Sequence, residues 1–191
     1  MSKKYVLFAV AHGTESIEFS APYDILKRAG AEIVIAKVKD SENDGKCLCF
    51  KTAQGLEIKA DCLIENTPEH DYSMIVCPGG LPNAETLGNN KNLVERLQKQ
   101  KKDGKICAAI CASPVMVFEK NGILDGHCGT GYPSMQSELK NQSRVKERVV
   151  VDGNIITSQG PCTAIEFGFT LCETLFGKDK AEELKKGMVF Y

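Results

Sequence analysis

The chain has 191 residues, of which 42% are hydrophobic and 26% are charged, and its formal net charge is −1. On the usual scale of roughly 150 residues per domain, this length predicts one soluble domain over residues 1–191. The balanced charge gives no reason to expect binding to nucleic acid or to an anionic membrane.

The first apolar segment, residues 5–11, is interrupted at once by His12. It is too short for a membrane span, which needs about 20 apolar residues, and it lacks the small-residue cleavage site of a secretory signal. We therefore expect a buried first strand in a protein of the cytoplasm or of a similar reducing compartment.

The chain contains nine cysteines, an odd number, and several of them lie in apolar runs. In a reducing compartment such cysteines are mostly small buried hydrophobic residues rather than halves of disulfides. The close pairs Cys47/Cys49 and Cys107/Cys111 lack the two Cys-x-x-Cys clusters of a structural zinc site. No bound metal is therefore expected.

Taken in chain order, strand-like apolar runs alternate with helix-like segments. Strands are predicted at residues 5–11, 33–38, 74–77, 106–110 and 155–157, and helices at residues 17–29, 92–102, 114–121, 163–176 and 180–186. Residues 40–59 differ, because a charged turn followed by short strands at 47–52 and 56–59 predicts a hairpin added to the main sheet. Continuous apolar strands are typical of a parallel sheet covered by helices on both faces, so the expected fold is an α/β sandwich.

The turn after the first strand has one glycine, Gly13, where a dinucleotide-binding fold has three. The chain also lacks the Gly-x-x-x-x-Gly-Lys-Ser/Thr loop of nucleotide-hydrolysing enzymes, so no nucleotide cofactor is expected. Open α/β sheets still bind ligands beyond the carboxyl ends of their strands. The residues that follow the strands are therefore the first candidates for chemistry.

Cys111 is the first of these candidates. It follows the buried strand at 106–110 directly, a helix is predicted to begin at Pro114, and small residues flank it at Ala109 and Ser113. This is the pattern of a nucleophile elbow, where the backbone turns so sharply that only small neighbours fit. The start of a helix stabilises a thiolate and lowers the pKa of the thiol. The alternative is one more buried cysteine, like Cys107.

A double glycine, Gly79-Gly80, ends the strand at residues 74–77. Glycines allow the backbone to approach another group closely with its N–H groups exposed. Together with the N–H of Ala112, these amides could form an oxyanion hole over the Cys111 sulfur. The alternative is a tight turn with no role beyond its geometry.

Two carboxylates, Glu15 and Glu18, lie three residues apart at the start of the first predicted helix. Acidic residues in a first helical turn usually interact only with the helix dipole, and this account suffices for Glu15. Glu18 lies between Ile17 and Phe19, which leaves its burial open.

Four segments of the chain resemble the signature blocks of the ThiJ/PfpI superfamily. They are ESIEF at 15–19, CPGG at 77–80, AAICA at 108–112 and TSQGP at 157–161, and they occur in order with compatible spacing. Within the superfamily the chain is similar to the DJ-type branch, which includes a parkinsonism-associated protein deglycase.

The resemblance implies a flavodoxin-like sandwich that forms a homodimer with the first helix at the interface. It implies that Cys111 is a reactive, oxidisable cysteine and that Glu18 is hydrogen-bonded to it. The remaining positions implied by the resemblance are the backbone of Gly79, Gly80 and Ala112 around the sulfur, Lys51 where family members often carry Arg in the pocket, and Arg28 near the dimer interface.

The chain departs from some family members at Tyr132, where a histidine precedes the proline beside the cysteine. None of the three histidines, His12, His70 and His127, has an obvious dyad position, so a protease-like Cys–His mechanism is not expected. Cys162, beside Pro161 at the start of a predicted helix, is a candidate for a second functional thiol in the pocket.

Without a histidine, Cys111 must be activated by the helix terminus, the amides and Glu18. An ionised Glu18 would raise the pKa of the thiol by repulsion, whereas a protonated one can donate to sulfur. A lowered pKa of Cys111 therefore requires a neutral Glu18 whose own pKa is raised by burial.

Such a pair suits a reaction that the resemblance implies, the conversion of methylglyoxal to lactate without glutathione, metal or nucleotide. The first hypothesis is thus a glyoxalase or deglycase acting on a small aldehyde or on a glycated thiol or amine. The alternative is a non-enzymatic redox sensor or chaperone of the oxidative-stress response, since an activated, accessible thiol is readily oxidised. A PfpI-like protease is the weakest hypothesis.

Overall fold

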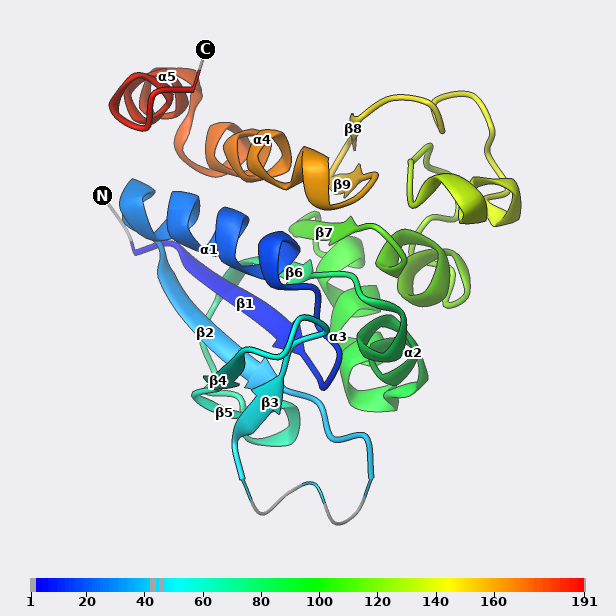
Figure 1. Cartoon of the computed structure of the whole chain (residues 1–191). Helices are drawn as coiled ribbons and strands as arrows, with labels where there is room; N and C mark the ends of the chain where they lie inside the picture. Colours follow the sequence, from blue (N-terminus) through cyan, green and yellow to red (C-terminus); the bar gives the residue numbers. More distant parts are fainter. Residues whose placement is uncertain (1–2, 42–43, 45–46, 191) are drawn as a thin grey trace.

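The computed structural model describes residues 3–41, 44 and 47–190, so half of the predicted charged turn lies outside the described residues. A seven-stranded sheet forms the centre of the molecule, in the order β5-β2-β1-β6-β7-β9-β8 (Figure 1). Its strands are β1 (Tyr5–Val10), β2 (Glu32–Lys37), β5 (Cys62–Leu63), β6 (Tyr72–Cys77), β7 (Ile106–Ile110), β8 (Val149–Asp152) and β9 (Ile155–Ser158). All neighbours are parallel except β8 and β9. The predicted flavodoxin-like α/β sandwich is confirmed.

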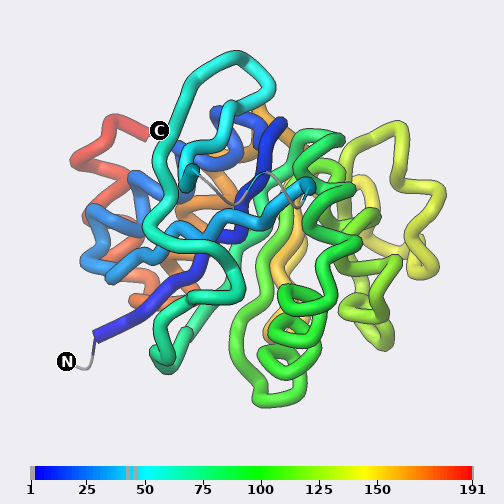
Figure 2. Tube along the Cα trace, turned by 90° about the horizontal axis from the view of Figure 1, so that it is seen from below, coloured from blue at the N-terminus to red at the C-terminus, as the bar shows by residue number. Residues whose placement is uncertain are grey.

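Helices cover both faces of this sheet (Figures 1 and 2). One face carries α1 (Ser16–Ala29), α4 (Ala164–Phe176) and α5 (Lys178–Gly187), and the other carries α2 (Leu81–Asn89) and α3 (Lys91–Lys102) with the π-helical turn η3 (Pro114–Glu119). Short 3₁₀ turns follow at η2 (Ile64–Asn66), η4 (Pro133–Glu138) and η5 (Pro161–Thr163). Among the described residues, no helix has the length and apolar character needed to cross a membrane.

Two apolar cores form because successive strand residues point to opposite faces of the sheet. Phe8 of β1 and Val76 of β6 pack toward α1 and α4, whereas their neighbours Leu7 and Ile75 pack toward α2 and α3. Phe8 and Leu7 are both fully buried. The sheet is therefore apolar on both faces, which explains the continuous apolar runs in the sequence.

The hairpin predicted at residues 47–59 exists, but its place in the fold was predicted wrongly. Strands β3 (Cys49–Lys51) and β4 (Glu57–Lys59) pair with each other in a separate two-stranded sheet. Backbone bonds tie this hairpin to the loop after β1, from Gly13 N–H to Lys51 O (2.8 Å) and from Ala53 N–H to Thr14 O (2.9 Å). The hairpin thereby covers the carboxyl end of the sheet.

One α-helix and two strands were not predicted, namely α2, β5 and β8, and neither were the 3₁₀ turns η2 and η4. Helix α2 contains Pro82, two asparagines and Gly88, all of which are weak helix formers. Tertiary packing stabilises it, since a side chain at Gly88 would collide with the backbone oxygen of Met116. Strand β8 lies at the sheet edge, and its three valines before Asp152-Gly153 are a local hairpin signal that the prediction did not use.

Candidate active site

Cys111 lies on a sharp turn at the carboxyl end of the central strand β7. Its backbone has a φ of +66°, a value that only one other non-glycine residue of the described chain approaches. The conformation is held from both sides, because Cys111 N–H donates to Ser158 O (3.0 Å) and Cys111 O accepts from Tyr132 N–H (2.7 Å). A strained residue fixed in this way is typical of a functional site.

Glu18 reaches the same place from the first turn of α1. Its side chain is fully buried. Glu15 caps the helix by accepting from Glu18 N–H (2.8 Å), and Glu18 Oε2 accepts from Gly79 N–H (2.9 Å). The second oxygen, Oε1, is buried without a protein partner of standard geometry among the described residues. The structure thus decides the burial of Glu18, which the sequence left open.

The Cys111 sulfur lies between the Glu18 carboxyl and two backbone amides. The backbone N–H groups of Gly80 and Ala112 lower the pKa of the Cys111 thiol, which places them beside the sulfur, and the nearby Glu18 carboxyl raises it. Gly79 does not act as predicted, because its N–H donates to Glu18 instead of facing the sulfur. The candidate oxyanion donors are therefore Gly80 and Ala112, while Gly79 hydrogen-bonds the Glu18 carboxyl.

Burial governs the protonation of this pair. Desolvation raises the pKa of Glu18 to about 7, against smaller opposing effects of its hydrogen bonds with Cys111 and Gly79. Burial, followed by the charge of Glu18, raises the pKa of Cys111 to about 12. The raised pKa predicted for Glu18 is thus found, but the lowered pKa predicted for Cys111 is wrong. The short π-helical turn and the two amides do not outweigh burial, so near pH 7 the thiol is protonated, whereas Glu18 is ionised in about half of the molecules.

Only glycine fits at position 79. A Cβ atom there would collide with Glu18 Oε2 and would lie 2.5 Å from Cys111 Cβ. We expect Gly79→Ala to lower the free energy of unfolding by about 1–3 kcal/mol, as overpacking of a close contact does. Urea unfolding measures this change.

Gly187→Ala is the matched control for that experiment, because a Cβ atom at Gly187 meets open space. Its effect should stay within about 0.5 kcal/mol, the usual range for exposed positions. Equal stabilities of the two variants would contradict the close contact at Gly79.

A cavity of about 500 Å³ opens over Cys111 and Glu18. Its walls come from the hairpin (Ala53 and Gln54), the loop at Gly80–Leu81 and the segment at 132–135, with Pro161 closing one side. Tyr132 lines it, in the place where some family members have histidine, and 44% of this residue remains exposed. The cavity can admit a small organic molecule to the sulfur.

The other predicted pocket residues lie outside this cavity. Lys51 is exposed on β3 and contributes backbone contacts, not a cavity wall. Cys162 is exposed and lines a neighbouring hollow that shares Tyr132 and Pro161 with the cavity. Arg28, which was predicted near a dimer interface and not in the pocket, lies on the exposed part of α1, where its Nε donates to Asp24 (2.7 Å).

None of the chain's histidines, all within the described residues, lines the cavity. His70 stacks on Tyr5 at the opposite end of the sheet, with ring centroids 4.1 Å apart, and His127 lies 3.6 Å from Asp152. His12 belongs to the hairpin contacts described below. A Cys–His dyad of the protease kind has no residues here to form it.

Comparison with known proteins shows the family of this chain. The sequence pattern of the DJ-1/PfpI family matches residues 4–174. The chain belongs to this family. The relationship predicted from the four sequence blocks is confirmed.

Individual relatives match over most of the chain. "Protein DJ-1 homolog B" of Arabidopsis thaliana is 40% identical over 95% of this chain, which spans only 40% of the plant protein. "Glutathione-independent glyoxalase DJ-1" of Schizosaccharomyces pombe is 36% identical, with 97% of each chain covered. The solved structure "Toxoplasma gondii DJ-1, oxidized" superposes with a TM-score of 0.91 at 37% identity, covering 98% of both chains.

In this DJ-1/PfpI protein, Asn83 is a positioning residue that the sequence did not reveal. It is fully buried, and its Oδ1 accepts from Ala11 N–H (2.7 Å) and from the Thr14 hydroxyl (2.9 Å). Its Nδ2 donates to the oxygens of Pro78 (2.8 Å) and Gly79 (3.1 Å). Asn83 therefore fixes the Gly79–Gly80 turn against the end of β1. An asparagine within a helix gives no sequence signal of this role.

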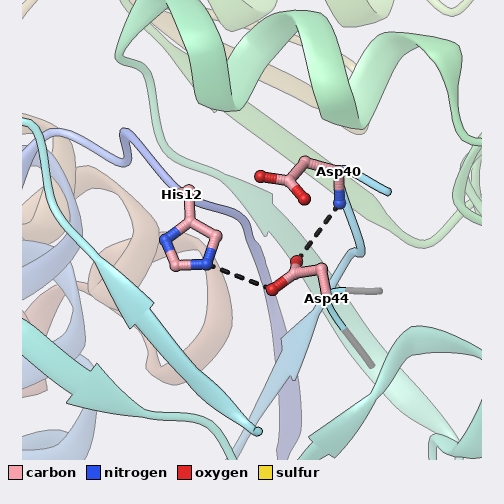
Figure 3. A group of neighbouring side chains, drawn as sticks. All are labelled: His12, Asp40 and Asp44. Carbon is pink, nitrogen blue, oxygen red and sulfur yellow. Dashed lines mark hydrogen bonds and ion pairs between the residues drawn. The ribbon is translucent and has the colours of Figure 1, made fainter. Parts of the chain in front are cut away.

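His12, Asp40 and Asp44 form a polar cluster beside the hairpin (Figure 3). His12 Nδ1 accepts from Lys51 N–H (3.0 Å), so Nε2 carries the proton that faces Asp44 Oδ1 at 3.2 Å. The ammonium of Lys37 lies 2.6 Å from the same oxygen. Donors already surround Asp44, which makes this cluster an ion-pair network between β2 and the hairpin and not a cation site.

Proposed function

We propose that this protein is a glutathione-independent glyoxalase or deglycase that uses Cys111 and Glu18. The observation that carries the proposal is one cavity in which a thiol, a carboxyl with a pKa of about 7 and two backbone N–H donors converge. The Schizosaccharomyces pombe relative is named a glutathione-independent glyoxalase, which supports the same reaction class. The substrates are methylglyoxal or its adducts with thiols and amines.

The first step is addition of the thiol to the aldehyde. Ionised Glu18 accepts the thiol proton as the sulfur bonds to the aldehyde carbon, so the thiolate exists only during the attack. The negative charge that develops on the aldehyde oxygen is stabilised by the amides of Gly80 and Ala112. Glu18 then returns the proton to this oxygen, which gives a hemithioacetal. A raised pKa of the Cys111 thiol is compatible with these steps, because Glu18 lies beside the thiol and accepts its proton during the attack.

The second step moves a proton between carbons. Glu18 removes the hydrogen from the former aldehyde carbon, which gives an enediol, and delivers a proton to the adjacent carbon. The product is a lactate thioester of Cys111, and water hydrolyses it to lactate and the free thiol. Atoms balance as methylglyoxal plus water giving lactate. No step needs a metal or a nucleotide.

The assembly proposed here is a homodimer, as the family resemblance implies. Helix α1 presents Arg28 and Asp24 on its exposed side, where they pair with each other and remain accessible to a second copy.

All nine cysteines lie among the described residues and none is in a disulfide, which fits a reducing compartment such as the cytoplasm.

A redox sensor is the second candidate function. Among the described residues, the buried Glu18 Oε1 has no hydrogen-bond partner, and the Glu18 carboxyl acts on the Cys111 thiol, so a protonated carboxyl could donate to an oxygen added to the sulfur. The similar structure from Toxoplasma gondii is of an oxidized DJ-1. Glu18→Gln separates the two functions, because a neutral amide can still donate to an oxidised sulfur but cannot transfer the substrate proton.

The test is lactate formation from methylglyoxal without glutathione, measured from about pH 5 to pH 9. Because Glu18 must be ionised to accept protons, the rate should rise with pH and level off above its pKa of about 7. Two pH units below this value the rate should be about 100-fold under the plateau. A rate that is independent of pH, or absent throughout, would overturn the assignment of Glu18 as the base.

A further inference from the structure

Cys47 and Cys49 form a thiol pair at the start of β3, outside the cavity over Cys111. Cys47 is exposed and Cys49 is half-buried. The backbone N–H of Cys49 donates to the sulfur of Cys47 (3.2 Å), and each thiol shifts the pKa of the other. These two thiols lie close together and are accessible to small molecules, whereas Cys77, Cys107 and Cys172 are buried in the core.

Lys37 contributes a positive charge beneath this pair. Its side chain is 1% exposed, and its ammonium donates to the backbone oxygens of Cys47 (3.0 Å) and Cys49 (2.7 Å). The Cys49 side chain and N–H, and then the charge of Lys37, lower the pKa of Cys47. The Cys47 side chain raises the pKa of Cys49 in turn. Cys47 is therefore the better nucleophile, and Cys49 keeps its proton until Cys47 has reacted.

We propose that Cys47 and Cys49 are a redox-active dithiol that exchanges with low-molecular-weight disulfides, independently of Cys111. The Cys47 thiolate attacks one sulfur of the disulfide, and the other sulfur leaves as a thiolate that takes up the proton released by Cys47. Cys49 then attacks the Cys47 sulfur, expels the second thiolate and gives it its own proton. Two protein thiols are oxidised and one disulfide is reduced to two thiols, so electrons and protons balance.

The test uses Cys111→Ser protein, so that the catalytic thiol does not contribute, and glutathione disulfide as the probe. Free thiols are alkylated after incubation, and trypsin releases both cysteines on one peptide, residues 47–51, because lysines lie at 46 and 51. We expect this peptide to lose two hydrogens and to escape alkylation at both cysteines. The exposed thiol of Cys162 is the internal control, and it should react several times more slowly.

Single variants establish the order of the two steps. Cys49→Ser should stop the reaction at a mixed disulfide between glutathione and Cys47, whereas Cys47→Ser should slow modification of Cys49 several-fold. Both substitutions lie at the solvent-facing start of β3, so folding should be unaffected, and circular dichroism verifies this. Complete alkylation of both cysteines in the Cys111→Ser protein, or a mixed disulfide that never closes there, would overturn the proposal.

Discussion

Replacing Cys111 by serine should lower the rate of lactate formation from methylglyoxal by at least about 1,000-fold, as loss of a nucleophile does. The serine hydroxyl has the same geometry, but it is far less acidic than a thiol and forms no thioester. The fold should persist, since the strained φ of +66° at this position is held by hydrogen bonds of the backbone. Lactate assayed without glutathione gives the rate, and far-ultraviolet circular dichroism shows that the variant is folded.

Cys128→Ser is the matched control for this loss. Cys128 lies outside the cavity, where its thiol contacts Asp152 Oδ2 at 3.3 Å, a contact that a serine hydroxyl can keep. Its rate should stay within about twofold of that of the unaltered protein. Comparable rates for Cys111→Ser and the unaltered protein would exclude Cys111 as the nucleophile and leave the redox function as the better account.

Glu18→Gln should have opposite effects on activity and on stability. The amide cannot accept the thiol proton or move a proton between carbons, so the rate should fall about 100- to 10,000-fold, the usual contribution of general acid–base catalysis. The same change removes a carboxylate that is fully buried. The variant should therefore be more stable than the unaltered protein at alkaline pH.

The sign of the stability effect follows from proton binding. The folded protein holds the Glu18 proton up to a pKa of about 7, whereas the unfolded chain releases it near the ordinary value of 4.5. Unfolding of the unaltered protein therefore becomes easier as pH rises through this interval, whereas the glutamine of the variant does not titrate. The stability advantage of the variant should grow by about 2.5 kcal/mol between about pH 5 and pH 8.

Urea unfolding at several pH values measures this growth. Glu182→Gln is the control, since Glu182 is a surface carboxylate whose pKa is lowered by Lys185 and which stays ionised across the interval. The free energy of unfolding of Glu182→Gln should change with pH in the same way as that of the unaltered protein. A constant difference between Glu18→Gln and the unaltered protein would show that Glu18 titrates normally in the folded state.

The two effects of Glu18 are physically linked. Burial that raises its pKa to about 7 costs stability, but it makes the carboxyl able to accept and return protons near neutral pH. Surrounding structure offsets the cost, through Gly79 N–H on the carboxylate and through Asn83, which holds the Gly79–Gly80 turn in place. The burial of Glu18 therefore lowers the stability of the fold and, at the same residue, gives the pKa that the proposed reaction requires.

Local patterns explain what could be predicted of the fold. The strands at β1, β6 and β7 are buried on both faces, so their sequences are continuously apolar and need no knowledge of their neighbours. The helix α1 ends where Gly30 adopts a φ of +101°, a conformation that favours glycine. In contrast, α2 depends on packing against Met116 in a later segment of the chain, and its sequence alone does not indicate a helix.

The same division holds for the active site. The sequence by itself located the sharp turn at Cys111, because the small neighbours of this residue and the apolar strand before it are local requirements of such a turn. Only the tertiary structure decided that Glu18 is buried and that Gly79, 61 residues away, binds its carboxylate. It also decided that Lys51 lies outside the cavity and that burial raises the pKa of Cys111. Backbone conformation follows from adjacent residues, whereas desolvation and hydrogen-bond partners depend on which distant segments the fold brings together.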